Sequence, residues 1–241
     1  MKHKIKEIQD DKELTDTEKA ILIIALYSLI DNNKNLHKIL ILHKEALEQI
    51  RKEVSYAINY SKDSKQLKKA LHNTVKDLSD KEIDIVRKAL QTTYKSNHTK
   101  LLDALEITDT GDLDDSFIDS EVEKEFYGDT YENRIIKNNK LLMLRLNEVM
   151  DQDKDITEID KEIKELLESK VSRSKLLFEN ELFRVHNLVL LYGAKELYAS
   201  GKVRYSAYLD HRTCDECSGF DGQVFNIEDA PALPRHPNCR C

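Results

Sequence analysis

Cysteine is absent from the first 213 residues of the chain. All four cysteines lie in the last 28 residues, at Cys214, Cys217, Cys239 and Cys241. This distribution excludes a disulfide framework that spans the whole chain. The chemistry of the thiols is therefore confined to the C-terminal segment.

A long apolar run is also missing. The most apolar stretch, residues 20–30, has 11 residues and would span about 16 Å as a helix, whereas a bilayer needs roughly 20 apolar residues. We therefore expect a buried core helix there and no membrane segment. The charged start, MKHKIKEIQDDKE, does not resemble a secretory signal, so we expect a cytosolic protein, in which paired cysteines are more often metal ligands or redox groups.

An excess of basic charge is absent as well. The net charge is −7 and charged residues make up 34% of the chain, which excludes a protein built around nucleic-acid binding over its whole surface. An ordinary, mildly acidic protein of 241 residues can form one large domain or two small ones.

Proline is absent from residues 1–200, and glycine occurs there only at Gly111, Gly128 and Gly193. Almost the whole stretch can therefore be helical. Two capping boxes, Thr15–Glu18 and Ser79–Glu82, indicate helix starts. Apolar periodicity predicts helices over residues 20–30, 35–60, 65–78, 79–105, from 131 to about 149, 156–166 and 172–200. Within the last, Glu181 and Arg184 are spaced to form a pair worth only a few tenths of a kcal/mol.

An acidic stretch interrupts this pattern. Residues 103–132 contain twelve Asp or Glu and one Lys. We interpret residues 107–120 as a solvated loop, although such a stretch could also dock a basic partner. The chain then divides into a helical region (1–106), this linker (107–120), a second helical region (121–200) and a C-terminal module (201–241).

The C-terminal module has a different pattern. Val203, Tyr205 and Ala207 alternate with polar or charged residues, as in a strand, and Asp221-Gly222 between apolar residues indicates a hairpin. All three prolines follow, in a loop. We therefore predict a mainly α fold, an elongated helical body that ends in a small β-hairpin and zinc-knuckle module.

The cysteines have the spacing of metal ligands. Cys214-x-x-Cys217 is followed after 18 residues by His236-x-x-Cys239 and then by Cys241. Two pairs at such spacing are typical of a closed structural zinc site, and thiolate and imidazole suit Zn²⁺ better than Ca²⁺ or Mg²⁺. We expect Cys214, Cys217, His236 and Cys239 as ligands, with Cys241 as a substitute for Cys239. Two disulfides or a C-x-x-C redox pair remain alternatives.

These residues carry a family resemblance. Asp210, Arg212, Thr213, Cys214 and Cys217 match D-x-R-T-C-x-x-C, and Asp221-Gly222 and Phe225 match a D-G-x-x-F segment. His236, Pro237, Cys239, Arg240 and Cys241 then match H-P-x-C-R-C. The whole resembles the C-terminal signature of phage head-morphogenesis proteins related to protein F of phage Mu. Weaker similarity, at Tyr127-Gly128, Arg134-Ile135 and Glu181, extends the resemblance to about residues 120–241.

The resemblance implies a non-enzymatic minor head (capsid) protein of the virion, assembled in the host cytoplasm. Its partners would be the portal, the major capsid protein or the scaffold, and possible contact with packaged DNA is a weaker expectation. Departures from the family pattern include Tyr208 where an aromatic, often Trp, precedes the Asp, and Glu179-Asn180 where Arg-Thr usually precedes Glu181.

Two alternatives come from other classes of function. A zinc module can bind nucleic acid, but residues 201–241 carry five Lys or Arg against six Asp or Glu, a balance that disfavours phosphate binding. We expect Arg212, Arg235 and Arg240 to pair with Asp210, Asp215 or Asp221. A nuclease or toxin could use His211 beside His236 as a base, but the chain shows no recognisable catalytic spacing, so we predict no catalytic residues.

Overall fold

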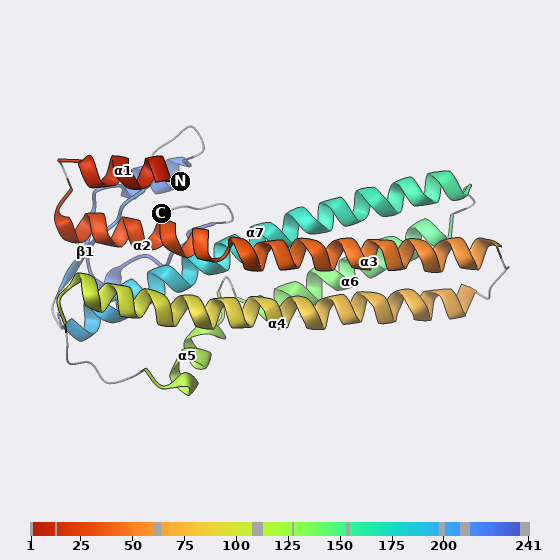
Figure 1. The fold of residues 1–241 in the computed structure, drawn as a ribbon, viewed down its shortest axis with the longest axis horizontal. Coiled ribbons are helices and arrows are strands. Elements are labelled where there is room, and N and C mark those ends of the chain that lie inside the picture. The colour runs from red at the N-terminus through yellow and green to blue at the C-terminus, as the bar shows by residue number, and fades with distance from the viewer. Residues whose placement is uncertain are drawn as a thin grey trace. The chain divides into compact units, whose positions relative to one another are not determined.

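The computed structural model describes residues 2–12, 14–59, 64–107, 113–126, 128–152, 155–197, 201–207 and 213–236. The predicted mainly α fold is confirmed (Figure 1). The helices are α1 (Lys2–Asp10), α2 (Asp16–Asp31), α3 (Asn33–Asn59), α4 (Ser64–Ala104), α5 (Asp115–Val122), α6 (Tyr131–Met150), α7 (Ile156–Leu197) and α8 (Asp215–Phe220). Strands β1 (Lys202–Arg204) and β2 (Val224–Asn226) and the short 3₁₀ helix η1 (Ile227–Asp229) complete the C-terminal part.

Two of these helices are longer than predicted. Helix α4 has 41 residues and α7 has 42, so the helices expected at 65–78 and 79–105 are one, as are those at 156–166 and 172–200. The predicted capping box at Ser79 was wrong, because Ser79 and Glu82 are buried inside α4. No proline or glycine lies within α4 to end the helix there. By contrast, α2 begins where its box predicted: the Lys19 amide donates to the Thr15 carbonyl at 2.9 Å.

The acidic stretch contains a helix. The prediction of a loop over 107–120 is wrong for residues 115–120, which belong to α5; residues 108–112 lie outside the described residues. Ile118 and Val122 of α5 are buried, so two apolar residues anchor an otherwise acidic helix. Phe117 contacts Tyr94 of α4 and Tyr192 of α7, with ring centroids 6.3 and 5.0 Å apart. Aromatic contacts of this kind stabilise the packing of this short helix. Its high density of acidic residues is the reason that the sequence predicted a loop there.

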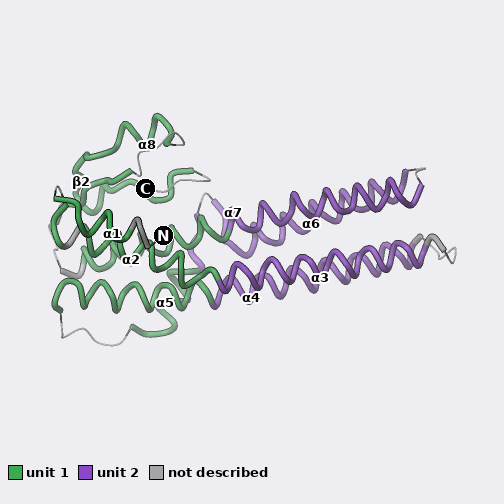
Figure 2. The backbone as a smooth tube through the Cα atoms, turned by 45° about the horizontal axis from the view of Figure 1, so that its top comes forward, with its two compact units in different colours: residues 1–33, 89–122, 178–241 green, residues 34–88, 123–177 purple. Residues whose placement is uncertain are grey.

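The chain forms two compact units (Figure 2). Unit 1 comprises residues 1–33, 89–122 and 178–241, and unit 2 comprises residues 34–88 and 123–177. Helices α4 and α7 contribute residues to both units. The division of the chain into four consecutive regions, which was proposed from composition, stays a prediction.

The core of unit 2 is contributed by four helices. Its buried apolar residues come from α3 (Leu42, Ala46, Ile50, Val54, Ala57), α4 (Leu67, Leu71, Val75, Leu78), α6 (Leu142, Leu146, Val149) and α7 (Ile159, Ile163, Leu167). Within each helix they recur at steps of three and four residues, which places them on one face. This stripe pattern gives unit 2 a continuous apolar interior.

Unit 2 also buries charge. The Lys170 ammonium donates to Glu82 Oε2 at 3.0 Å and to Ser174 Oγ at 2.7 Å, and His43 Nε2 lies 3.5 Å from Glu82 Oε1. The Lys170 and Glu82 side chains are only 3% and 1% exposed. Burial alone would raise the pKa of the Glu82 carboxyl, but the facing His43 and Lys170 side chains lower it to about 2. Burial lowers the pKa of Lys170. We call His43, Glu82, Lys170 and Ser174 the buried polar cluster.

In unit 1 the pair predicted between Glu181 and Arg184 forms, but it is buried. Arg184 Nε donates to Glu181 Oε2 at 2.7 Å, and the two side chains are 4% and 0% exposed. The remaining guanidinium nitrogens donate to the carbonyls of Glu121 and Val122, at 3.2 and 2.6 Å, and so satisfy the C-terminal end of α5. The expected few tenths of a kcal/mol applies to exposed pairs, whereas removing either partner of this buried pair would leave an unpaired buried charge at a larger cost.

The strand pair differs from the predicted hairpin. Strands β1 and β2 are antiparallel, with Val203 opposite Phe225, but α8 lies between them in the chain. Phe220 ends α8, and Asp221-Gly222 forms the turn from α8 into β2, where Gly222 has a φ of +76° that favours glycine. The Asp-Gly signal therefore marked a real turn, but the prediction of a hairpin across it was wrong. Among the described residues, no helix is both long and apolar enough to cross a membrane.

The buried polar cluster predicts a large stability difference between matched variants. We expect Lys170→Met to lower the free energy of unfolding by about 3–5 kcal/mol, because it leaves the Glu82 carboxylate buried without its cation. The combination of Glu82→Leu with Lys170→Met should recover most of this loss. As a control, Arg51→Ala removes an exposed pair with Asp160 and should cost less than about 1 kcal/mol. Urea unfolding measures all three, and equal losses for K170M and R51A would contradict the prediction.

The same cluster predicts a pH dependence. The pKa of Glu82 falls from an ordinary 4.5 to about 2 in the folded state, so its charge stabilises the fold above pH 4.5 and this contribution is lost as the pH falls through about 2. The difference in unfolding free energy between the wild type and Glu82→Gln should shrink as the pH is lowered over this window. Asp84→Asn, on the exposed side of α4, serves as the control and should differ little from the wild type throughout. A difference for Glu82→Gln that grows on acidification would contradict this account.

Candidate metal centre

The two cysteines of the C-x-x-C motif lie on the first turn of α8. Cys214 precedes the helix in an extended conformation, and its carbonyl accepts a hydrogen bond from the Ser218 amide at 2.9 Å. Its Sγ accepts from the Cys217 amide at 3.4 Å. The thiol thus takes the capping position that Ser or Asp usually holds. The turn places the two sulfur atoms on the same side of the helix start.

His236 completes a group of three potential ligands. Its Nε2 lies 3.0 Å from Cys214 Sγ and 3.3 Å from Cys217 Sγ, and all three donor atoms lie within 4.8 Å of one another. Zinc bonds to sulfur and nitrogen of about 2.3 and 2.0 Å imply a sulfur–nitrogen separation of about 3.5 Å on a tetrahedron. The three residues therefore fit a metal ion of this type.

The segment that carries His236 is held to α8 by its neighbour. Arg235 Nε donates to Glu216 Oε1 at 3.0 Å, and the guanidinium lies 5.4 Å from the centroid of the Phe220 ring. Glu216 was not among the predicted partners of Arg235, which were Asp210, Asp215 and Asp221; Asp210 lies outside the described residues. An ion pair and a cation–π contact to one short helix place the following residue, His236, beside the cysteines.

An aromatic cluster packs around Phe220, on the helix that begins at the cysteines. Phe220 packs against Tyr205 and Phe225, with ring centroids 5.4 and 5.9 Å apart, which joins α8 to the segment after β1 and to β2. The Tyr205 hydroxyl donates to Cys217 Sγ at 3.4 Å. Sequence reasoning used Tyr205 only as a strand residue and missed this contact, and no spacing in the sequence signals it.

The electrostatics of the site favour a thiolate at Cys214. The hydrogen bond from the Cys217 amide lowers the pKa of the Cys214 thiol, and the adjacent His236 ring lowers it further. A thiolate is the form that binds metal. Cys214 is partly exposed, whereas Cys217 is 1% exposed.

The structure therefore brings together three of the five predicted ligands. Cys239 and Cys241 lie outside the described residues, as does His211. Cys214 and Cys217 are not joined to each other by a disulfide. The C-x-x-C does open a helix, but the flanking strands pair antiparallel, which is not the βαβ setting of a redox motif.

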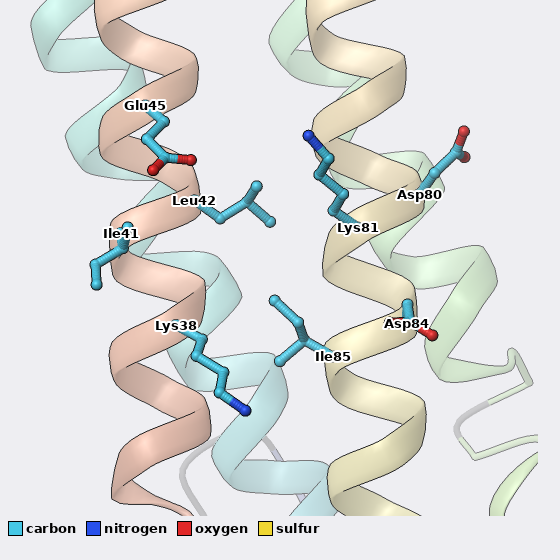
Figure 3. Close-up of a pocket in the computed structure, with 8 residues that line it drawn as sticks. All are labelled: Lys38, Ile41, Leu42, Glu45, Asp80, Lys81, Asp84 and Ile85. Carbon is cyan, nitrogen blue, oxygen red and sulfur yellow. The ribbon is translucent and has the colours of Figure 1, made fainter.

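Each unit also contains hollows away from the cysteines. In unit 2, Leu42 of α3 and Ile85 of α4 point into the space between the two helices (Figure 3). The same hollow is lined by the charged residues Lys38, Glu45, Asp80, Lys81 and Asp84. In unit 1, a cavity of about 610 Å³ is lined mainly by apolar residues of α2, α4, α7 and the C-terminal module, Tyr205 among them. Neither set of described lining residues resembles a metal or catalytic site.

Comparison with known proteins agrees with the predicted family. Residues 143–241 match the family model described as Phage Mu protein F like protein, a family of phage head-morphogenesis proteins. The predicted resemblance is confirmed over those residues. For residues 120–142 it stays a prediction. No curated protein and no solved structure matches the chain.

The lowered pKa of Cys214 predicts selective reactivity. In metal-free protein, iodoacetamide should alkylate Cys214 at a lower pH than an ordinary thiol and faster than buried Cys217. His236→Gln should move the Cys214 profile toward higher pH, whereas His37→Gln, an exposed histidine on α3, should not. Peptide mapping by mass spectrometry assigns the modified cysteine. An identical profile for H236Q and wild type would contradict the role of His236.

Proposed function

We propose that the protein is a minor head protein that acts structurally in phage head morphogenesis, with a C-terminal module stabilised by one zinc ion. The observation that carries the proposal is that Cys214, Cys217 and His236 converge inside the segment that matches the Mu F-like family. Cys239 is the proposed fourth ligand and Cys241 its substitute.

The zinc would be structural. Four protein ligands leave no open position for a water molecule, so the ion would supply folding energy and not a hydrolytic nucleophile. The C-terminal module needs such help, because its described apolar interior is small, with Tyr205, Cys217 and Ile227 as its buried residues of this kind. This supports a non-enzymatic role.

The proposed partners are the portal, the major capsid protein or the scaffold, with the virion as the final location. The helical units offer surface for such contacts: Ile41 on α3 and Leu144 on α6 are 43% and 61% exposed. Nucleic acid is a weaker candidate, because Arg235 is engaged by Glu216 and Phe220.

The metal is tested on full-length protein purified without added metal. We expect about one zinc per chain, lost in Cys214→Ser, Cys217→Ser and His236→Gln and retained in His37→Gln. Elemental analysis with a protein assay gives the ratio. Metal-free wild type would overturn the zinc site.

The role in the head is tested by assembly. Heads produced by the encoding phage should contain the chain, and loss of the chain should give absent or aberrant heads. If C214S gives the same defect while the protein accumulates in soluble form, the zinc module is needed for assembly. Normal infectious heads without the chain would overturn the proposed role.

A further inference from the structure

Tyr205 is held in place by the strand pair. Its amide donates to the Gln223 carbonyl at 2.8 Å, and its carbonyl accepts from the Gly222 amide at 2.9 Å, so the antiparallel pairing extends one residue beyond β1. Both partners belong to the turn that joins α8 to β2. The backbone of Tyr205 is thus fixed relative to the helix that carries the cysteines.

The side chain of Tyr205 is oriented as well. Its ring packs on Phe220 with an interplanar angle of 39°, and the residue is only 4% exposed. With the backbone and ring held, the hydroxyl reaches Cys217 Sγ at 3.4 Å. Because the backbone and the ring are already fixed, the hydroxyl loses little further conformational entropy when it forms this hydrogen bond.

We propose that Tyr205 is a positioning residue of the metal centre, which acts through its hydrogen bond to Cys217. The inference rests on the proposed zinc site. A metal-bound thiolate retains negative charge, and at 1% exposure Cys217 has almost no access to water. The Tyr205 hydroxyl supplies part of the missing solvation and holds the sulfur toward His236 and Cys214. Hydrogen-bonding groups behind a ligand commonly change metal affinity 10- to 100-fold.

The same contact couples the metal to the strands. Because one residue bonds both Cys217 and the turn before β2, loading the metal should stabilise the Tyr205–Gly222 and Tyr205–Gln223 hydrogen bonds. The amides of Tyr205 and Gly222 should then exchange more slowly with solvent when zinc is bound.

The test compares Tyr205→Phe with the wild type as full-length chains. Phenylalanine keeps the ring contact and removes only the hydroxyl. We expect zinc affinity, measured by competition with a chelating dye, to fall about 10- to 100-fold. The thiolate-to-metal absorption band of the Co²⁺-loaded protein should shift, because the Cys217 sulfur loses its donor. Tyr56→Phe, at a 52% exposed position on α3, should change neither.

The outcomes separate this inference from the proposed function. If the wild type binds zinc and Y205F matches its affinity and cobalt spectrum, the role of Tyr205 is overturned and the metal site stands. If the wild type binds no zinc, the metal site itself is overturned, and this inference with it. If Y205F does not fold, hydrogen exchange on the wild type decides: protection of the Tyr205 and Gly222 amides by zinc supports the coupling, and unchanged exchange overturns it.

Discussion

The uninterrupted backbone hydrogen bonding of α4 and α7 is the constraint on which most of this structure depends. Each helix exceeds 40 residues, and each contributes residues to both compact units. Proline is absent from both helices, and the single glycine, Gly193 of α7, allows close packing: a Cβ there would lie 2.6 Å from a methyl carbon of Leu101. Because neither helix is interrupted, a polar residue in its middle cannot reach solvent through a local break in the helix. Such residues must find partners where the helix places them.

The buried polar cluster of unit 2 follows from that constraint. Glu82 and Lys170 lie 88 residues apart in the chain, and a close ion pair with further hydrogen bonds offsets the cost of removing both charges from water. A pair of leucines could fill the same space, so the charges need not raise the stability. Their directional bonding gives α4 and α7 one preferred alignment within unit 2, because a shifted alignment would bury both charges without partners.

The C-terminal module has only a small apolar interior. It pairs two three-residue strands around one short helix, which encloses little apolar surface. The aromatic contacts among Tyr205, Phe220 and Phe225 and the convergence of His236 with the two cysteines replace a larger core. In this arrangement the three candidate ligands and the aromatic residues beside them belong to one network, because Tyr205 contacts both Cys217 and the turn before β2.

The sequence by itself indicated the helical class and the resemblance to the Mu F-like family over residues 143–241, and it predicted the ligand types, because helix breakers, cysteine spacing and the motif around Cys214 are local features. It also placed the Asp221-Gly222 turn correctly. It could not determine which helices are continuous, since the Ser79–Glu82 pattern is the same at a helix start and inside a helix. Only the tertiary structure decided that Glu82 meets Lys170, that Arg235 meets Glu216 and that Tyr205 reaches Cys217. Each of these contacts joins residues that are not neighbours in the chain, 12 to 88 residues apart, so its formation depends on packing, which local sequence does not encode.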